Sequence, residues 1–331
     1  MTTHHPARPD RPAEHDWQAR PGGPAGFAVA GEVAAALRDG RPVVALESTI
    51  LSHGFPHPRN RALADEMLAA VRAAGAEPAL VAVADGAIQV GAGAGLLDRL
   101  CRGGAAHKAS RRDLAVHIAA GHLAATTVAA TAWAAARCGI GVFATGGIGG
   151  VHRYAATLPP AFPDLSGDIP GLADAPIAVI SAGAKSILDL PATMEALEAF
   201  GVPVVGYRTG EFPAFHAADS GIALAHAVQD IEGLAAIVAT QRRLGLSAAI
   251  LVVQPPPEGA RIAMAELEGW IAEALAQAEA RGIAGPAVTP FLLAAMDRLS
   301  AGRTTGTNAA LAVANAGLGG ALAVALAQGA I

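Results

Sequence analysis

Two lysines stand out in this sequence, because they are the only ones in a chain that has 23 lysine and arginine residues in all. Lys185 lies in the run Ser-Ala-Gly-Ala-Lys-Ser-Ile-Leu-Asp, directly after a short apolar stretch, and Lys108 lies in His-Lys-Ala-Ser-Arg-Arg-Asp-Leu. Arginine stays charged in proteins, whereas a desolvated lysine can lose its proton and attack a carbonyl-type carbon. Lys185 is therefore a candidate nucleophile. The alternative is a structural lysine whose stem packs against the start of a helix.

Glu47 is the candidate proton donor. It follows an apolar run in the stretch Ala-Leu-Glu-Ser-Thr-Ile-Leu-Ser-His-Gly. A carboxyl group at the end of a buried strand is partly desolvated, which raises its pKa and suits it to donating a proton. The alternative is a glutamate that caps or pairs locally.

Two further stretches have the composition of anion-binding sites. Lys108 stands close to Arg111 and Arg112, as a phosphate or carboxylate site would require, although a solvated basic helix start has the same composition. In Phe-Ala-Thr-Gly-Gly-Ile-Gly-Gly-Val-His-Arg, four glycines after a strand would let backbone N–H groups approach an anion. The side chains of Thr145, His152 and Arg153 would add donors. The segment lacks the glycine spacing of the dinucleotide-binding fingerprint.

Asp164 and Asp168 are candidate metal ligands. They flank Ser166 and Gly167 in the run Phe-Pro-Asp-Leu-Ser-Gly-Asp. Hard divalent ions such as Mg²⁺ and Mn²⁺ prefer carboxylate oxygens and retain water. A turn or a helix cap is the alternative for this pattern.

The elements that must position these residues alternate along the chain. Apolar runs predict strands over residues 42–46, 79–84, 141–145, 177–181, 203–207 and 249–253. Helical spacing predicts helices over residues 61–74, 126–137, 186–200, 231–244, 264–281 and 291–299. This alternation is typical of an α/β protein with a mainly parallel sheet and helices on both faces (α/β/α). In such sheets ligands bind at the carboxyl ends of the strands, where Lys185 is expected to lie.

The two ends of the chain differ from the middle. Residues 1–25 are rich in Pro, His and Arg and lack apolar periodicity, so we expect a disordered tail, without a secretory signal, before one large domain over residues 26–331. After Arg303 the chain is uncharged and long enough to span a bilayer. It consists mainly of Ala and Gly with Asn308 and Asn315 interspersed, which favours an interior helix packed through small residues and no membrane contact.

Composition narrows the function classes. The chain has 331 residues and a net charge of −5, with 15% charged, 53% hydrophobic and 4% aromatic residues. Low charge implies extensive burial in a core or subunit interface, and the lack of a basic cluster or of stacking aromatics argues against nucleic-acid binding. Cys101 and Cys138 form no disulfide framework, which fits packed thiols in the reducing cytoplasm.

Read in order, these motifs resemble those of one family. The segments ALESTI-SHG, K-SRRDL, ATTVA-T, FATGGIGGVHR, D-S-D, AGAKSILD, GVPVVGY, EFPAF and TPFLL are similar to those of the pseudouridine-5′-phosphate glycosidases, also described as indigoidine-synthase-A-like proteins. The resemblance runs from about Ala30 to about Asn315. It implies reversible cleavage of the C–C glycosidic bond of pseudouridine 5′-phosphate to uracil and ribose 5-phosphate. It also implies a hydro-lyase classification, a divalent cofactor that is typically Mn²⁺, and a homotrimer.

The resemblance also implies roles for individual residues. Lys185 matches the nucleophile that bonds C1′ of the ribose as an imine (Schiff base), Glu47 the proton donor, and Asp164 the metal-binding aspartate. The residues that match positions in contact with substrate are Lys108, Val128, Ser166, Gly167 and Asp168, with Thr145 and His152 at the phosphate and Asn308 as a further contact.

Two departures from the family pattern lie near these residues. Tyr154-Ala155-Ala156 replaces the usual Gly-Ala-Glu and is followed by an insertion through Pro160, and Gln254 replaces an Asn. Both departures predict altered substrate recognition with the imine chemistry retained. Two other functions fit the same pattern: a related lyase of the indigoidine-pathway type acting on another ribosyl phosphate, and a non-catalytic sugar-phosphate-binding protein.

Overall fold

A single continuous sheet forms the centre of the molecule. The computed structural model describes residues 23–102, 104, 106–153, 164–283 and 285–329; the N-terminal tail up to residue 22, Tyr154 and the insertion through Pro160 lie outside this range. The sheet has eleven strands, nine of them in the order β1-β4-β3-β2-β7-β9-β13-β11-β12, while β6 pairs with β3 and β5 with β6. The strands are β1 (Phe27–Val29), β2 (Val43–Leu46), β3 (Glu77–Ala84), β4 (Ala87–Val90), β5 (His107–Ala109), β6 (Ala124–Thr126), β7 (Val142–Ala144), β9 (Ala178–Ser181), β11 (Val204–Tyr207), β12 (Ala227–Val228) and β13 (Ile250–Val253).

The six strands that the sequence predicts are six neighbours in this sheet. Strands β3, β2, β7, β9, β13 and β11 lie side by side, and every pair among them is parallel. The antiparallel pairs lie to one side, where β4 and β6 each pair with β3. The predicted α/β class with a mainly parallel sheet is therefore confirmed.

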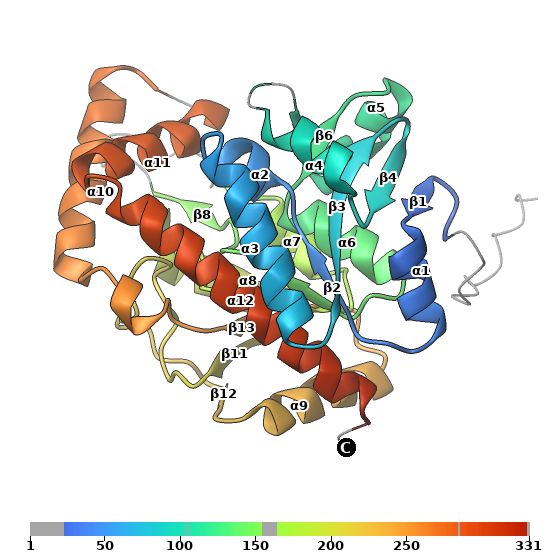
Figure 1. The fold of residues 1–331 in the computed structure, drawn as a ribbon. Helices are drawn as coiled ribbons and strands as arrows, with labels where there is room; N and C mark the ends of the chain where they lie inside the picture. The colour runs from blue at the N-terminus through green and yellow to red at the C-terminus, as the bar shows by residue number, and fades with distance from the viewer. Residues whose placement is uncertain (1–22, 103, 105, 154–163, 284, 330–331) are drawn as a thin grey trace, which may run out of the picture.

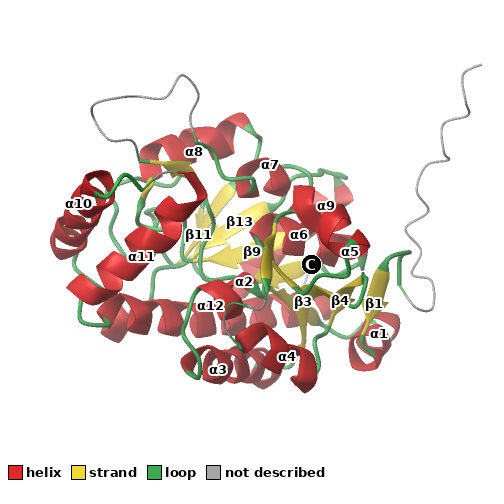
Figure 2. Ribbon diagram, turned by 90° about the horizontal axis from the view of Figure 1, so that it is seen from above, coloured by secondary structure: helices red, strands yellow, loops and turns green. Residues whose placement is uncertain are grey.

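Helices cover both faces of the sheet, which explains why its central strands β2, β7, β9 and β13 are apolar and buried throughout. Successive residues of β2 alternate between two hydrophobic clusters, with Val43 and Ala45 in one and Val44 and Leu46 in the other. The first cluster includes side chains from α1 (Gly31–Arg38), α6 (Val128–Arg137), α7 (Asp168–Leu172), α8 (Leu190–Ala199), α10 (Met264–Ala280) and α11 (Val288–Leu299). The second includes side chains from α2 (Thr49–His53), α3 (Arg59–Ala73), α4 (Ala94–Cys101), α9 (Ile231–Arg243) and α12 (Arg303–Ala327). Seen from above, the central strands lie between α7 and α8 on one side and α12 and α3 on the other (Figure 2).

The long C-terminal helix α12 runs diagonally across one face, beside α3 (Figure 1). By length and composition it is a helix that could cross a membrane, yet 61% of its most apolar window is buried inside the protein. A Cβ atom added to Gly319 would lie 3.2 Å from the Cβ of Ala144, and one on Gly320 would lie 2.5 Å from the Cβ of Ala74. The predicted interior helix, packed through small residues, is confirmed.

The helix predicted to begin at residue 186 begins later, so Lys185 does not lie at a helix start. Leu188–Asp189 forms the short strand β10, which pairs with β8 (Val151–His152). Asp189 then caps α8 by accepting a hydrogen bond from the Ala192 N–H at 2.9 Å, with Pro191 in the first turn. Lys185 therefore lies in a loop between β9 and β10.

The remaining described elements are short. Helix α5 (Leu114–Ala119) follows the 3₁₀ turn η1 (Arg111–Asp113), and η2 (Glu258–Ala260) and η3 (Gly285–Ala287) flank α10. Cys101 and Cys138 are both buried, as expected of packed thiols, and burial raises the pKa of the Cys138 thiol to about 12.

Candidate active site

Three adjacent strands place the candidate nucleophile and acid at the same edge of the sheet. Glu47 directly follows β2, Thr145 directly follows β7, and Lys185 lies in the loop after β9. These strands are parallel neighbours in the order β2-β7-β9, so their carboxyl ends lie together. The candidate acid and nucleophile thus flank the end of β7.

Glu47 is buried, with only 7% of its surface exposed. Its Oε1 accepts a hydrogen bond from the Thr145 hydroxyl. Burial raises the pKa of the Glu47 carboxyl and the charge of Asp168 adds to the rise, whereas Lys185, the Thr145 hydrogen bond and Lys108 oppose it. Glu47 therefore keeps its proton to a higher pH than an ordinary glutamate, as a proton donor must.

The two lysines belong to the same site. Lys185 is half-buried, and its backbone N–H donates to the Ile148 carbonyl at 3.1 Å. Lys108, on β5, is exposed as a residue, yet partial desolvation lowers the pKa of its ammonium, and the positive charge of Lys185 lowers it further. Asp168 and Glu47 oppose that shift. The charges of these four residues act on one another, so the structure brings them together.

A buried serine and histidine fix the loop that carries Lys185. The Ser186 hydroxyl lies 2.9 Å from Nδ1 of His216, and both side chains are buried. Burial lowers the pKa of His216 to about 4, opposed by a hydrogen bond to the Thr304 backbone. His216 is therefore neutral near pH 7. Gly183 in the same loop has a φ of +82°, and a Cβ there would collide with the Pro213 carbonyl.

The glycine-rich segment between β7 and β8 packs closely against its neighbours. A Cβ atom on Gly147 would lie 2.5 Å from the Phe215 ring, and Cβ atoms on Gly149 and Gly150 would collide with the hydroxyls of Ser166 and Thr193. Backbone amides of the segment are also used inside the protein: Gly149 donates to Asp168 at 2.9 Å, and Val151 donates to Thr193 at 3.0 Å. Close packing therefore explains why glycine is needed at these positions, without any requirement for a bound anion.

Two arginines expected near an anion each pair with a carboxylate of the same chain. Arg153 makes two 2.9 Å hydrogen bonds to the carboxylate of Glu268 on α10, and it donates to the carbonyls of Leu188 and Ser186 at 3.0 and 3.2 Å. It therefore braces the Lys185 loop. Arg111 pairs with Asp174 at 2.6 Å. That these guanidinium groups also hold an anion stays a prediction.

Asp168 acts as a cap on two neighbouring segments. Its carboxylate is buried; one oxygen accepts from the Ala129 N–H at 3.1 Å, in the first turn of α6, and the other accepts from Gly149. Val128, a predicted substrate contact, is the first residue of the same helix and is also buried. Ser166 accepts from the Asp168 N–H at 3.2 Å, with Gly167 between them at the start of α7. The structure thus brings this group of predicted contacts together.

Asp164 has the character of a ligand for a hard metal ion. It is exposed, and its carbonyl accepts from the His152 N–H at 3.0 Å. Burial lowers the pKa of His152, and the charge of Asp164 opposes that effect. Both oxygens of Asp168 already accept amide hydrogen bonds, so an ion at this segment would take one carboxylate ligand from Asp164 and the rest from water.

Two asparagines of α12 reach the start of the glycine-rich segment. Oδ1 of Asn308 is buried without a hydrogen-bond partner among the described residues, close to Gly146. A buried polar atom without a partner is costly, so this side chain is available to a ligand. Asn315 donates to the carbonyls of Thr145 and Gly146 at 2.8 and 3.2 Å and accepts from Gln254 at 2.9 Å. Gln254, which departs from the family pattern, thereby supports the Thr145 segment that holds Glu47.

The sequence reasoning missed His216 and the structural role of Asn315. His216 directly follows the Glu-Phe-Pro-Ala-Phe run that carries part of the resemblance. A polar side chain inside an otherwise Ala- and Gly-rich helix was the available signal for Asn315.

A mainly parallel α/β sheet that places a lysine and a buried acid at its carboxyl edge is typical of an enzyme active site. The family model for indigoidine synthase A like proteins matches residues 32–325. The chain belongs to this family.

Named relatives and solved structures agree with that assignment. The chain is 52% identical to a pseudouridine-5′-phosphate glycosidase of Methylobacterium nodulans, over 89% of this chain and 86% of the relative. It is 48% identical to the enzyme of the same name from Cupriavidus pinatubonensis, over 90% and 94% of the two chains. Its fold matches the prealnumycin C-glycosynthase AlnA in complex with ribulose 5-phosphate, with a TM-score of 0.84 and 37% identity over 92% and 98% of the chains. It also matches an indigoidine synthase A-like protein of Thermotoga maritima, with a TM-score of 0.81 and 31% identity over 96% and 100%.

Proposed function

We propose that this chain reversibly cleaves the C–C glycosidic bond of pseudouridine 5′-phosphate to uracil and ribose 5-phosphate. The observation that carries the proposal is the placement of Lys185 and of the buried Glu47, whose pKa is raised by burial, on either side of the end of β7. The names of the relatives and the sugar phosphate in the AlnA complex support the choice of substrate. In the reverse direction the reaction joins uracil to ribose 5-phosphate and releases water, the sense in which it is a hydro-lyase reaction.

The bond to be broken requires unusual chemistry, because the leaving atom is C5 of uracil rather than a heteroatom. In the proposed mechanism the Lys185 amine bonds to C1′ as the C1′–O4′ bond breaks, and the amine proton passes to O4′. Glu47 then gives its proton to C5, and the C1′–C5 bond breaks as the lysine nitrogen forms a double bond to C1′. Water hydrolyses this imine, which releases the open-chain sugar phosphate and returns the proton to Glu47.

The other site residues would bind and orient the substrate. Lys108 and His152 are proposed to bind the phosphate, and Asn308 is proposed to offer its buried amide oxygen, which has no hydrogen-bond partner among the described residues, to a hydroxyl or to the base. The Thr145 hydroxyl already donates to Glu47, so its main proposed role is to hold the acid. The proposed contacts around the cap of α6 are Val128, Ser166, Gly167 and Asp168.

A divalent cation such as Mn²⁺ is proposed to bind at Asp164 and to supply positive charge beside the substrate oxygens. Sites with one carboxylate and several waters bind loosely. We therefore expect a chelator to suppress uracil release reversibly, and Asp164→Asn to raise the Mn²⁺ concentration needed for half-maximal rate. Full activity in excess chelator would remove the metal from the proposal.

The test of the proposed function compares two lysine variants. Lys185→Arg keeps the positive charge but cannot form the imine, so uracil release should be lost. Binding of ribose 5-phosphate should stay within about 1–2 kcal/mol, the scale of one hydrogen bond. Lys108→Arg is the matched control, with weaker binding and residual turnover. Borohydride added with ribose 5-phosphate should leave a covalent adduct on the peptide containing Lys185. Normal turnover by Lys185→Arg, or an adduct that persists in that variant, contradicts the assignment.

A second candidate function is C–C bond formation between a sugar phosphate and a partner other than uracil. The likeness to a C-glycosynthase favours it, as does Gln254, which lines a hollow of about 250 Å³ together with Tyr207, Arg208 and Arg261. Both functions share the Lys185 imine. Uracil turnover far below that with another aromatic acceptor would select the second function.

A further inference from the structure

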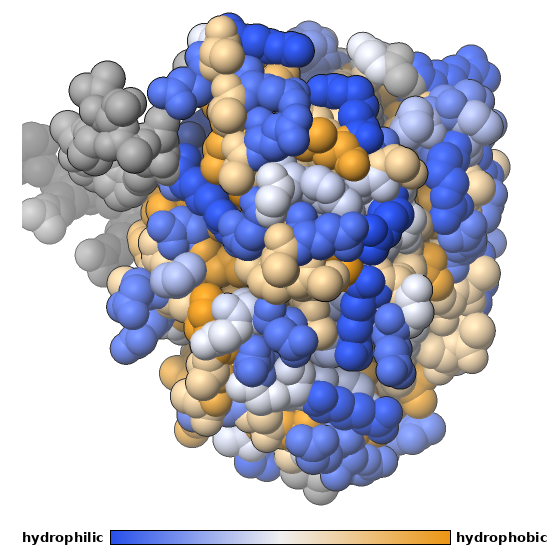
Figure 3. Space-filling model, turned by 90° about the vertical axis from the view of Figure 1, so that its left-hand side faces the viewer, coloured by the Kyte–Doolittle hydropathy of each residue, from blue (hydrophilic) through white to orange (hydrophobic). Residues whose placement is uncertain are grey.

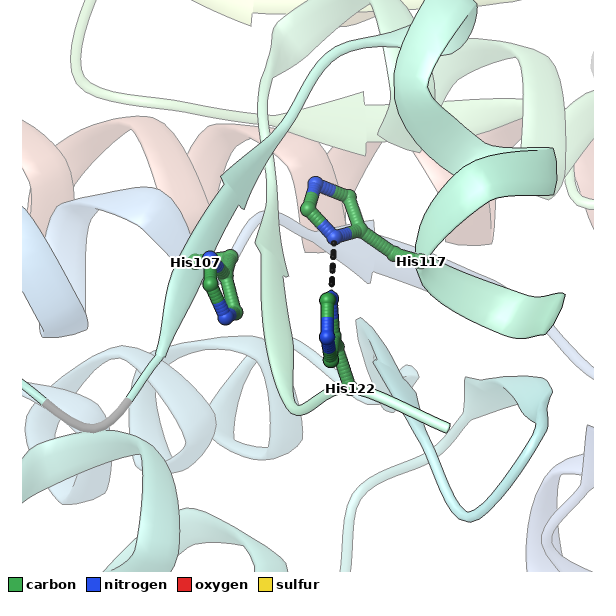
Figure 4. Close-up of side chains that lie close together, drawn as sticks. All are labelled: His107, His117 and His122. Carbon is green, nitrogen blue, oxygen red and sulfur yellow. Dashed lines mark hydrogen bonds between the residues drawn. The ribbon is translucent and has the colours of Figure 1, made fainter. Parts of the chain in front are cut away.

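We propose that His107, His117 and His122 form a binding site for a transition-metal ion that prefers imidazole ligands, with Zn²⁺ as the simplest case. The three side chains come from β5, α5 and the turn before β6, and their rings lie close together (Figure 4). This site is separate from the proposed carboxylate site at Asp164, and its test does not depend on the proposed reaction.

The backbone fixes the three positions before any ion binds. Strand β5 pairs with β6 so that His107 lies opposite Ala124, and the His107 N–H donates to the Leu123 carbonyl at 2.9 Å. The His122 N–H donates to the carbonyl of His117 at 3.0 Å and closes the turn after α5. The three α-carbons are therefore held by sheet and turn hydrogen bonds. Only side-chain rotations remain to be fixed.

The ring nitrogens lie at nearly the separation that a metal ion requires. One ring nitrogen from each histidine lies within 4.8 Å of the other two, and the Nδ1 atoms of His117 and His122 are 3.2 Å apart. At a bond length of about 2.0–2.1 Å, two nitrogens of a tetrahedral zinc site are about 3.3 Å apart. The His107 and His122 rings stack with centroids 4.4 Å apart. Because stacked rings direct their lone pairs side by side, the His107 ring must turn out of the stack before its nitrogen can point at the same ion.

The ligand types decide which ions fit. Imidazole suits Zn²⁺, Cu²⁺, Ni²⁺ and Fe²⁺, whereas Mg²⁺ and Mn²⁺ prefer oxygen ligands. The cluster supplies three nitrogens and no carboxylate, so the hard ion proposed for Asp164 is not its match. His107 is exposed and His117 and His122 are half-buried, which leaves a fourth position open to water or to a ligand from solution.

An ion bound at this site would also link neighbouring elements and stabilise the folded chain. His107 directly precedes Lys108 on β5, a strand of three residues whose named pairing partner is β6. An ion bound to all three histidines would tie this short strand to α5 and to the turn before β6. It would stabilise the folded state, since an ion that binds the native chain and not the unfolded one raises the melting temperature.

The experiment uses an untagged full-length chain in which His4, His5 and His15 are replaced by Gln, because these tail histidines would also bind metal. This parent is stripped of metal and titrated with Zn²⁺ by calorimetry and with Co²⁺ by visible absorption. We expect one tightly bound ion per chain, cobalt d–d bands, and a rise in melting temperature with Zn²⁺ that the cluster variants lack.

His117→Gln should weaken Zn²⁺ binding by more than about 100-fold, since even the outer partners of metal ligands are worth 10–100-fold. His107→Gln, at the exposed position, repeats the test if His117→Gln does not fold. His226→Gln, which replaces an exposed histidine outside the cluster, should bind as the parent does. Absence of a bound ion in the parent, or equal affinity in the parent and in both cluster variants, would overturn the proposal.

Discussion

The carboxyl of Glu47 has an energetic cost in the folded protein. Because burial raises its pKa, the folded chain holds this proton to a higher pH than the unfolded chain does. The stability that the proton provides is fully present below the ordinary pKa of 4.5, and it is lost as the pH rises through the raised pKa of the folded state. The proposed catalytic acid is thus also a source of instability at higher pH.

Glu47→Gln removes this pH dependence. Relative to the parent, the variant should gain stability above about pH 4.5, by about 1.4 kcal/mol per pH unit until the raised pKa is passed. It should also lose uracil release, because an amide cannot donate the proton. Urea unfolding between pH 4 and 8 measures the first effect, and Glu195→Gln, at an exposed position, is the control. A constant difference between Glu47→Gln and the parent over this range would show that Glu47 does not titrate abnormally.

At the residue scale, the sequence could indicate groups whose chemistry is visible in their own neighbourhood. Lys185 and Glu47 each follow a predicted strand, so both could be placed at the carboxyl edge of the sheet. The partners that fix them could not be found in this way. Ser186 pairs with His216 thirty residues away, and Asn315 contacts the Thr145 carbonyl across 170 residues. Only the folded chain brings such groups together.

At the scale of elements, the length of a strand or helix largely decided whether it could be predicted. The six predicted strands are continuous apolar runs in the middle of the sheet, whereas β8, β10 and β12 have two residues each and show no periodicity. Helix α2 has five residues and was missed for the same reason. The start of α8 was readable, since Asp189 followed by Pro191 is a typical helix start. The prediction placed the start too early because the apolar spacing directly after Lys185 also fits a helix.

Helix α12 offers a matched pair of glycines for testing its packing. Gly320→Ala would place a methyl group 2.5 Å from the Cβ of Ala74 and should destabilise the protein by about 1–3 kcal/mol, as overpacking does. Gly317 lies in the same helix with nothing within 4 Å of its added Cβ, so Gly317→Ala should be neutral or stabilise by up to about 1 kcal/mol. Urea denaturation of both variants measures the difference. Equal stabilities would mean that α12 does not pack closely on α3.

At the scale of the whole molecule, composition predicted extensive burial, and the covered sheet accounts for much of it. The surface is mixed: hydrophilic and hydrophobic residues alternate over the face in Figure 3. Large apolar side chains that remain exposed among the described residues include Val116, Phe200, Leu244 and Leu246. Scattered exposed residues of this kind are normal and do not by themselves locate a subunit interface.

We predict a homotrimer in the cytoplasm, from the low charge content and the family resemblance. Sedimentation of the purified chain at micromolar concentration should give one species of three times the chain mass of 32.9 kDa. The protein should also be recovered from cells without detergent, because α12 is mostly buried inside the chain. A monomer at that concentration, or a protein extracted only with detergent, would contradict this prediction.

The position of α12 has a consequence for how the protein is made. Strands β2 and β9, which precede Glu47 and Lys185, lie on either side of β7. Helix α12 contacts all three strands. During synthesis on the ribosome, the sheet emerges first and the helix that covers it emerges after every strand. Until then one apolar face of β2, β7 and β9 is uncovered, and Thr145 lacks its contact with Asn315. A chain that stops before residue 303 would therefore expose an apolar sheet surface to chaperones and proteases. The segments that hold Glu47 and Lys185, the proposed catalytic groups, would lack their contacts with α12.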